Sequence, residues 1–216
     1  MHNQYSLVAI LPMKANSSRV KGKNFRSFCG KPLYQWILNT LLACVEIDLI
    51  IINTDAKELL LKTGISHSNR ILIRERPKEL CGDFVSMNRI IENDLENINS
   101  DTYLMTHTTN PFLSSQTISK ALKLYKSSID LQTHDSLFSV NSFQTRFYKQ
   151  NGIPINHDPT NLIRTQDLEI WLEENSNLYL FNQESFNKTK NRIGEYPILF
   201  KTPKYESIDI DEESDW

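Results

Sequence analysis

The sequence predicts an α/β fold with a mostly parallel mixed sheet flanked by helices. The first observation is a series of short apolar runs of the kind that buried strands show, such as residues 7–13 and 48–53. The second is that segments with apolar residues at helical spacing, such as residues 33–45, separate these runs. Strands that alternate with helices favour parallel pairing, with helices on both faces of the sheet.

The individual elements are expected in the following order. Strands are predicted at residues 7–13, 48–53, 70–74, 102–106, 136–140, 177–181, 197–201 and 207–210. Helices are predicted at residues 33–45, from Ala56 onward, at 86–98, around 118–125 and at 183–188. Thr54 or Asp55 is expected to cap the second helix, and Glu58 would close a capping box with Asp55.

A polar stretch interrupts the alternation after the fifth strand. Residues 143–166 are rich in Asn and contain Gly152, Pro154 and Pro159. The stretch is too long for a simple connection between two elements. It is therefore interpreted as either an inserted hairpin or a dimer-forming element.

The composition is that of an ordinary globular protein. Of 216 residues, 39% are hydrophobic and 23% are charged, and 24 basic against 26 acidic side chains give a net charge of −2. This length suits one domain, and the near-neutral charge disfavours a nucleic-acid surface. The apolar runs are much shorter than the ~20 residues of a membrane span. Because the first residues also lack a secretory signal, we expect a cytoplasmic protein without a membrane partner.

The cysteines are few and carry no pattern. Cys29, Cys44 and Cys81 form no CxxC pair, so neither a disulfide framework nor a thiolate metal site is expected. We predict that all three are reduced thiols.

Positive charge is concentrated in the loop after the first strand. Residues 14–26 contain five cations, namely Lys14, Arg19, Lys21, Lys23 and Arg26. Open α/β sheets bind their ligands at the carboxyl ends of the strands, which is where this loop begins. The loop has neither a GxGxxG nor a Walker pattern, so side chains, helped by Asn16 and Ser17, would have to hold an anion. A solvated basic loop is the alternative.

Two carboxylates lie close together near the carboxyl end of the sequence. In a strand over residues 207–210, Asp209 and Asp211 would project to the same side. Mg²⁺ is usually held by one or two carboxylates together with substrate phosphates and water, so this pair suits a magnesium site opposite the basic loop. An acidic tail that includes Glu212, Glu213 and Asp215 is an equally good reading of the spacing.

A short polar loop follows the predicted strand at 102–106. Residues 106–111 offer several small hydrogen-bonding side chains and end in Pro111, which is typical of a binding loop. His107 has no second histidine or carboxylate at metal-binding spacing, so we expect it to be a hydrogen-bonding residue rather than a metal ligand or a base. No motif for covalent catalysis is found.

Several motifs occur in order along nearly the whole chain. They are Lys23-Asn24, Gly30-Lys31-Pro32-Leu33, Arg76-Pro77 with Leu80 and Asp83, Thr109-Asn110-Pro111, Arg164 with Gln166-Asp167, Glu174-Asn175 with residues 178–181, and residues 208–211 with Asp215-Trp216. Together they resemble the acylneuraminate cytidylyltransferase family, the CMP-sialic acid synthetases.

The resemblance implies a Rossmann-like nucleotidyltransferase fold in which residues 1–216 form one domain and residues 143–176 form a small inserted dimerisation element. It implies a Mg²⁺-dependent enzyme that activates a nonulosonic, sialic-type sugar acid with CTP and releases pyrophosphate. The implied partners are CTP, the sugar acid and a second copy of the chain in a homodimer.

The resemblance also implies roles for single residues. The implied catalytic residues are Lys14, Lys23 and Asp211. The implied nucleotide-binding residues are Lys14, Asn16, Ser17, Arg19, Lys23, Asn24, Ser86 and His107. The implied sugar-binding residues are Thr109, Asn110, Arg164 and Gln166, of which the last two could reach the sugar carboxylate across a dimer interface. Asp209 and Asp211 are the implied Mg²⁺ ligands.

Three positions depart from the family pattern. Lys14 replaces an arginine and so loses a bidentate fork, His107 replaces a glutamine, and Leu113 replaces an arginine. One alternative is therefore a nucleotide-binding module without catalysis. Another is a 3-deoxy-manno-octulosonate cytidylyltransferase, whose basic loop is similar to residues 18–23, although its Gln-Gly-Asp-Glu-Pro segment is missing here. A sugar-1-phosphate nucleotidyltransferase is disfavoured because its glycine-rich loop is absent.

Overall fold

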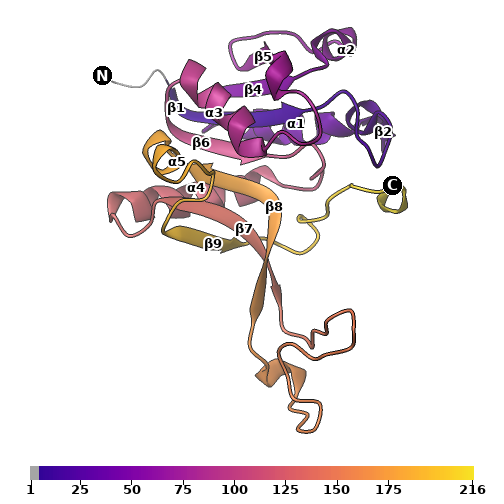
Figure 1. The fold of residues 1–216 in the computed structure, drawn as a ribbon. Helices are drawn as coiled ribbons and strands as arrows, with labels where there is room; N and C mark the ends of the chain where they lie inside the picture. Colours follow the sequence, from indigo (N-terminus) through magenta and orange to yellow (C-terminus); the bar gives the residue numbers. More distant parts are fainter. Residues whose placement is uncertain (1–4) are drawn as a thin grey trace.

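In the computed structural model, which describes residues 5–216, one seven-stranded sheet organises the chain (Figure 1). The strand order is β5-β4-β1-β6-β8-β7-β9, and only β8 runs antiparallel to its neighbours. The strands are β1 (Tyr5–Met13), β4 (Leu49–Thr54), β5 (Ile71–Glu75), β6 (Ser100–Thr106), β7 (Ser136–Phe143), β8 (Trp171–Phe181) and β9 (Pro197–Lys201). The mostly parallel mixed sheet predicted from the sequence is confirmed.

Helices cover both faces of this sheet. The α-helices are α1 (Leu33–Ala43), α2 (Lys57–Lys62), α3 (Met87–Asn97), α4 (Ser115–Asp130) and α5 (Gln183–Thr189), and short 3₁₀ turns are η1 (Lys23–Phe25), η2 (Lys78–Leu80), η3 (Thr165–Asp167) and η4 (Glu213–Asp215). Alternate residues of β1 point to opposite faces, so Leu7 and Ala9 pack with α1, α2 and α4, whereas Val8 and Ile10 pack with α3 and α5. The two resulting apolar clusters form the core.

Two local predictions are wrong. Residues 207–210 form no strand: Ser207 ends a turn and residues 208–210 lie outside the sheet, where the backbone N–H of Ile210 donates to the Thr109 carbonyl oxygen (2.9 Å). Helix α2 begins after Ala56 without a side-chain cap, and no capping box forms. The Asp55 carboxylate accepts a hydrogen bond from the backbone N–H of Ala15 at 2.6 Å instead, which ties the basic loop to the end of β4.

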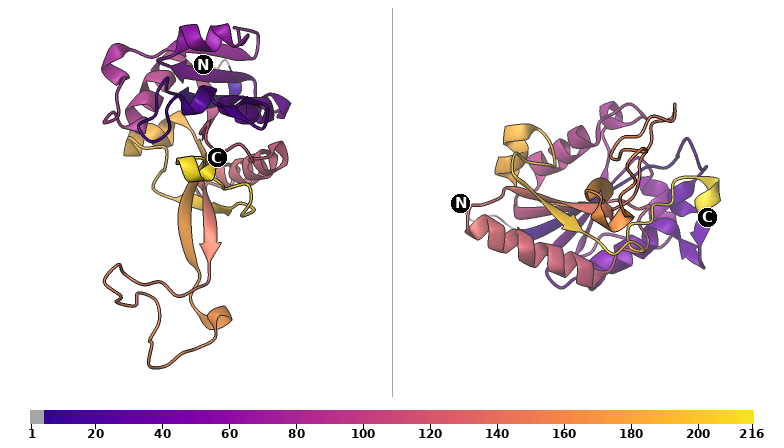
Figure 2. Two further views of the ribbon diagram at one scale, coloured as in Figure 1. Left: turned by 90° about the vertical axis from the view of Figure 1, so that its right-hand side faces the viewer. Right: turned by 90° about the horizontal axis from the view of Figure 1, so that it is seen from below.

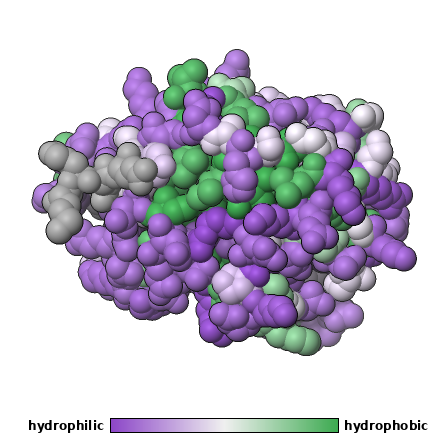
Figure 3. Space-filling model, turned by 90° about the horizontal axis from the view of Figure 1, so that it is seen from above, coloured by the Kyte–Doolittle hydropathy of each residue, from purple (hydrophilic) through white to green (hydrophobic). Residues whose placement is uncertain are grey.

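Strands β7 and β8 continue beyond the sheet as a long hairpin. Their pairing extends to Phe143 opposite Trp171, and residues 144–170 form the end of the projection, which stands away from the body in Figure 1 and in the left view of Figure 2. The stretch is therefore an inserted hairpin, one of the two interpretations of the sequence, and its role as a dimer-forming element stays a prediction. At the other edge of the sheet, the surface around β5 and α2 shows an apolar band bordered by hydrophilic side chains (Figure 3).

The C-terminal segment folds back onto the loop that follows β1. A two-stranded hairpin of β2 (Ser27–Phe28) and β3 (Lys31–Pro32) forms part of that loop. The Trp216 ring packs edge-on against Phe28 (5.8 Å between centroids), and the Arg26 guanidinium lies 4.2 Å from its centroid. Contacts between these two segments, far apart in sequence, bring the predicted acidic pair next to the basic loop.

A buried polar network connects α3 with the ends of β4 and β5. The Asp94 carboxylate is fully buried and accepts hydrogen bonds from Asn53 Nδ2 (2.8 Å) and from Arg74, while Arg76 Nε donates to Asn53 Oδ1 (2.8 Å). Burial raises the pKa of Asp94 to about 6, although the hydrogen bond from Asn53 and the charge of Arg74 oppose this shift. The network fixes strand ends that adjoin the candidate site.

Replacing Asp94 with alanine should lower the free energy of unfolding by about 3–5 kcal/mol, because Arg74 and Asn53 would lose their buried partner. Urea unfolding followed by circular dichroism measures this change. The control is Glu96→Ala on the same helix, whose side chain is exposed and should shift the value by less than about 0.5 kcal/mol. Equal effects of the two substitutions would show that the Asp94 network contributes no stability.

Candidate functional site

A polar pocket of about 320 Å³ lies at the carboxyl ends of β1 and β6. Most of the residues that the resemblance assigned to nucleotide binding line it, and so does Thr109, which it assigned to sugar binding. They are Lys14, Asn16, Ser17, Arg19, Lys23, Asn24, His107 and Thr109, together with Pro12, Ser18, Asp83, Met87 and Thr108. These side chains therefore lie together at the carboxyl ends of parallel strands, which is where open α/β sheets bind their ligands.

The basic loop is held in place by side-chain hydrogen bonds. Asn24 Nδ2 donates to the Lys14 carbonyl oxygen (2.7 Å), and Thr108 Oγ1 donates to Asn24 Oδ1 (2.6 Å). Asn24 is buried, so its amide joins the loop after β1 to the loop after β6 rather than facing solvent. The loop turns at Gly22, whose φ of +63° is a conformation that favours glycine.

Asp211 brings two of the cations together. Its carboxylate contacts Lys23 Nζ through Oδ1 (2.6 Å) and Arg19 Nη2 through Oδ2 (2.5 Å). The Lys23 side chain is only 8% exposed, so its charge depends on this partner. Lys14 is held separately, by the Gly82 carbonyl oxygen (3.1 Å) and Asp83 (3.2 Å). Three cationic groups thus surround one pocket and are compensated by carboxylates.

Buried anchors fix the segment that carries the two aspartates. Glu206 is buried and accepts hydrogen bonds from the backbone N–H and the hydroxyl of Ser114, both at 3.0 Å, at the N-terminus of α4. Ile210 is also buried, while Asp209 and Asp211 on either side of it are more exposed. The sequence analysis did not identify Glu206, because a single glutamate in a polar stretch carries no motif.

The two carboxylates have a donor set that fits Mg²⁺. Thr109 donates a hydrogen bond to Asp209, and Asp209 shares Arg19 and Lys23 as charged neighbours with Asp211. Partial desolvation and the charge of Asp211 raise the pKa of Asp209, a shift that a bound cation would reverse. Within residues 5–216 no group of three or more His, Cys, Asp or Glu side chains is placed to hold a metal. The other ligands would therefore be water and substrate oxygens, as is common for Mg²⁺.

His107 is kept neutral by its surroundings. Desolvation, reinforced by the positive charges of Arg192 and Lys23, lowers its pKa to about 3, although Asp211 opposes the shift. A neutral imidazole offers one donor and one acceptor, which agrees with the predicted hydrogen-bonding role. Leu113, another position that departs from the family pattern, is buried in the core beside α4 and does not reach the pocket.

The remaining predicted residues lie outside this pocket. Asn110 is buried next to the Ile208 carbonyl, and Ser86 caps α3 by accepting from the backbone N–H of Asn88 (3.3 Å). Arg164 and Gln166 lie on the projecting hairpin, where Arg164 pairs with Asp167 (2.7 Å). A single chain therefore does not bring these two side chains to the site.

A second, polar recess adjoins the pocket and was missed by the sequence analysis. Its volume is about 230 Å³, and it is lined by Ser86, Met87, Asn88, Glu174, Asn191, Arg192 and Ile193. Met87 lines both hollows. Glu174 belongs to the motif of Glu174-Asn175 with residues 178–181, but Arg192 lies in a polar turn in which the sequence shows no motif. Larger hollows of about 400 and 540 Å³ lie elsewhere, beside α5 and α2, and neither gathers cations around a shared carboxylate.

Comparisons with known proteins show the family of the chain. A family model described as cytidylyltransferase matches residues 8–214. The chain is 24% identical to an N-acylneuraminate cytidylyltransferase of Escherichia coli O18:K1:H7 over 97% of its own length, but spans only about half (50%) of that relative. It is 26% identical to the CMP-N,N'-diacetyllegionaminic acid synthase of Legionella pneumophila, covering 97% of this chain and 93% of that protein.

A solved structure supports the fold. A CMP:2-keto-3-deoxy-manno-octonic acid synthetase complexed with CTP aligns with a TM-score of 0.64 at 12% identity, over 97% of this chain and 94% of that one. At this identity the likeness concerns the fold alone. No helix within residues 5–216 has the length and apolar character needed to cross a membrane, and the thiols of Cys29, Cys44 and Cys81 are free, as predicted.

The depressed pKa of His107 predicts a specific dependence of stability on pH. Its folded-state value of about 3 lies below the ordinary 6.5, so between these values the unfolded chain binds a proton that the folded chain does not. The free energy of unfolding should therefore fall as pH decreases below 6.5, by at most about 1.4 kcal/mol per pH unit from this residue. His107→Gln should remove that part of the slope in urea unfolding measured from pH 7 to pH 4. A His107 ring that titrates near pH 6.5 by NMR would contradict this account.

Proposed function

Because the chain belongs to the cytidylyltransferase family, we propose that it activates a nonulosonic, sialic-type sugar acid with CTP and forms the CMP-sugar and pyrophosphate. The observation that carries this proposal is the convergence of Lys23 and Arg19 on Asp211 beside Lys14, in a pocket at the strand ends. Such a group of cations suits a triphosphate, and the carboxylates suit its metal ion. The names of the relatives support the choice of sugar acid.

The reaction requires positioning and charge compensation rather than a covalent intermediate. The anomeric hydroxyl of the sugar acid attacks the α-phosphorus of CTP, and the bond between that phosphorus and the bridging oxygen to the β-phosphate breaks. Lys14, Arg19 and Lys23 bind the β- and γ-phosphates and stabilise the negative charge that develops on pyrophosphate. On binding, Arg19 and Lys23 exchange part of their contact with Asp211 for phosphate oxygens.

The other pocket residues orient the substrates. Asn16, Ser17 and His107 offer hydrogen-bonding groups to the nucleotide, and Asn24 fixes the loop that presents them. Thr109 is the predicted sugar-binding residue that lines the pocket. Asp209 and Asp211 would hold Mg²⁺, which supplies further charge compensation at the phosphates.

The first test is pyrophosphate release by the purified protein with Mg²⁺ and CTP. The panel contains N-acylneuraminate, N,N'-diacetyllegionaminic acid, pseudaminic acid and 3-deoxy-manno-octulosonate, with ATP, GTP and UTP as nucleotide controls. We expect release that needs CTP and one nonulosonic acid. Release with octulosonate alone would replace the substrate class, and CTP binding without release from any member would favour a binding module.

Lys23→Ala and Asp211→Asn should each lower kcat about 10²- to 10³-fold while the circular dichroism spectrum stays that of the folded parent, because the first removes a cation that would bind the phosphates and the second a carboxylate that would hold Mg²⁺. The matched control is Lys21→Ala, an exposed cation of the same loop that does not line the pocket. Its kcat should stay within about twofold of the parent. Turnover near the parent value in Lys23→Ala or Asp211→Asn would refute the assigned role.

The projecting hairpin is proposed to form a homodimer, which would allow Arg164 and Gln166 to reach the sugar carboxylate of a neighbouring site. Its apolar side chains are unusually exposed for a single chain. The exposed ones include Tyr148, Ile153, Ile155, Leu162, Ile163 and Ile170. An apolar surface of this kind is typical of a protein interface.

Light scattering should therefore give the mass of two chains. Leu162→Asp should shift the protein to a monomer, because the substitution would bury a charge in the contact. Gln150→Asp, at an exposed polar position of the same hairpin, adds the same charge and should leave the dimer intact. A monomeric parent protein would exclude the proposed cross-subunit role of Arg164 and Gln166.

A further inference from the structure

The recess beside the nucleotide pocket contains an ion pair that the proposed mechanism does not use. Glu174 comes from β8, and Arg192 comes from the turn after α5. Met87, at the start of α3, separates this recess from the pocket that holds Lys14 and Lys23. A substrate whose reacting hydroxyl lies in the pocket can therefore extend a substituent into the recess.

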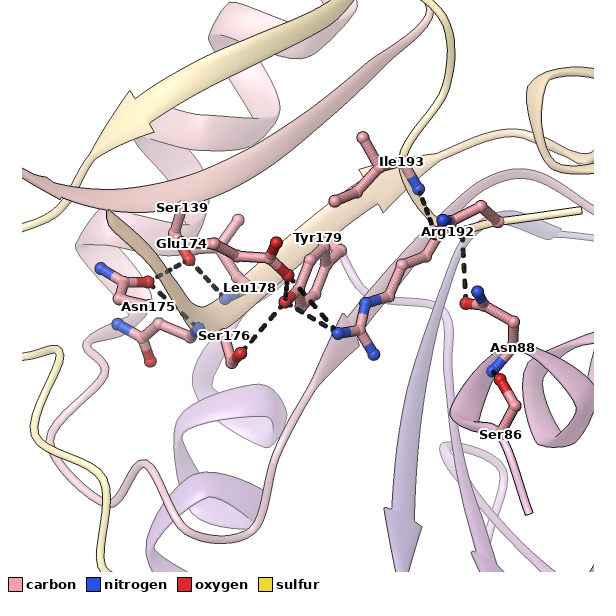
Figure 4. Close-up of polar contacts among 12 residues, drawn as sticks. Ser86, Asn88, Ser139, Glu174, Asn175, Ser176, Leu178, Tyr179, Arg192 and Ile193 are labelled. Atoms are coloured by element: carbon pink, nitrogen blue, oxygen red, sulfur yellow. Dashed lines mark hydrogen bonds and ion pairs between the residues drawn. The ribbon is translucent and has the colours of Figure 1, made fainter. Parts of the chain in front are cut away.

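Glu174, which lines the recess, lies at an irregularity in β8 and points toward Tyr179 and Arg192 (Figure 4). In the pairing with β7, Val140 lies opposite Glu174 and Phe138 lies opposite Tyr179. Residues 175–178 of β8 therefore form a bulge opposite a single β7 residue, Ser139. Ser139 Oγ stabilises the bulge by donating to Asn175 Oδ1 (2.6 Å) and accepting from the Leu178 backbone N–H (2.9 Å). Bulges of this type re-aim side chains next to binding sites.

Arg192 is held against the same group of residues. Its guanidinium lies 3.9 Å from the Tyr179 ring centroid, and its Nη2 donates to the Tyr179 hydroxyl (2.9 Å) and lies 3.6 Å from Glu174 Oε1. Burial raises the pKa of Tyr179 to about 12, so the phenol stays protonated and its hydroxyl donates a hydrogen bond to Glu174. The backbone N–H of Arg192 also donates to Asn88 Oδ1 (3.4 Å), which fixes the turn to α3.

Both partners of the pair have free hydrogen-bonding capacity toward the recess. Among the residues that the structure describes, Nε and Nη1 of Arg192 donate to no protein acceptor, and its side chain is only 16% exposed. Glu174 is 42% exposed, and its Oε2 accepts from no described residue. The recess thus offers donors and an acceptor side by side.

We propose that the Glu174–Arg192 pair is a specificity site for a neutral substituent of the sugar acid that both donates and accepts hydrogen bonds, an acylamino or a hydroxyl group. The two charges largely compensate each other, so an anionic substituent would face Glu174 and a cationic one would face Arg192. An amide or hydroxyl accepts from Arg192 and donates to Glu174 at once. This inference rests on the proposed function and deepens it.

The test combines enzyme variants with substrate analogues. KM for the sugar acid and kcat are measured by pyrophosphate release with the member of the panel that reacts, and Kd for CTP is measured by calorimetry. Arg192→Leu should raise KM for the sugar acid roughly 10- to 100-fold, while Kd for CTP changes by less than about twofold. Glu174→Gln should give a smaller increase, because an amide still offers an acceptor. Arg89→Leu, an exposed arginine on α3, should change neither value.

An analogue cycle distinguishes recognition from a structural role. Analogues in which one substituent at a time is replaced by hydrogen are assayed with the parent and with Arg192→Leu. Removing the substituent that Arg192 recognises should raise the KM of the parent 10- to 100-fold. The same removal should not raise the KM of Arg192→Leu any further, so the effects of the two changes do not add. Comparing acylamino with hydroxyl at that carbon then shows which of the two groups is preferred.

The outcomes separate the two levels of the proposal. If the parent releases pyrophosphate and Arg192→Leu keeps its KM for the sugar acid, or if the losses add for every analogue, the specificity site is refuted and the proposed function stands. If the parent releases no pyrophosphate with any sugar acid, the proposed function and the specificity site both fail. A rise in KM for the sugar acid together with an equal rise in Kd for CTP would show that Arg192 has only a structural role.

Discussion

The site depends on the compensation of positive charge by Asp211. Arg19 and Lys23 would repel each other across a small pocket, and Lys23 is almost entirely removed from water. One carboxylate that contacts both cations allows the loop after β1 to fold before any ligand binds. In the proposed reaction the same carboxylate would compete with the phosphates of CTP for those cations. The segment that carries Asp211 is held opposite this loop by contacts of its own.

The C-terminal segment is held through side-chain anchors rather than through the sheet. Glu206 accepts hydrogen bonds from Ser114, the N-cap residue of α4, Ile210 is buried, and Trp216 packs on the hairpin of the basic loop. A strand at this position would have fixed the aspartates in one register through backbone hydrogen bonds to a neighbouring strand. An anchored segment outside the sheet leaves both carboxylates partly exposed to water, in contact with Thr109, Arg19 and Lys23 of the pocket.

The sequence was sufficient to predict the sheet and the clustering of cations in the basic loop, because both depend on local patterns. Buried parallel strands leave continuous apolar runs, and five cations in one loop are visible without a structure. The predicted strand at 207–210 failed because its backbone pairs with Thr109, a contact that alternation cannot reveal. The cap at Asp55 failed for a similar reason, since the carboxylate accepts from Ala15 across the strand ends. Tertiary hydrogen bonds outweighed local propensity in both cases.

The recess around Arg192 shows why part of a site can escape a sequence analysis altogether. Glu174 and Tyr179 are five residues apart, so a regular strand would place them on opposite faces. The bulge opposite Ser139 removes that constraint and brings the carboxylate to the phenol. Ser176 takes a φ of +55° within this bulge, a conformation that is costly for a serine and that the surrounding hydrogen bonds must stabilise. A bulge of this kind leaves no alternation in the sequence, and the residues that it aims at the recess can be recognised only in three dimensions.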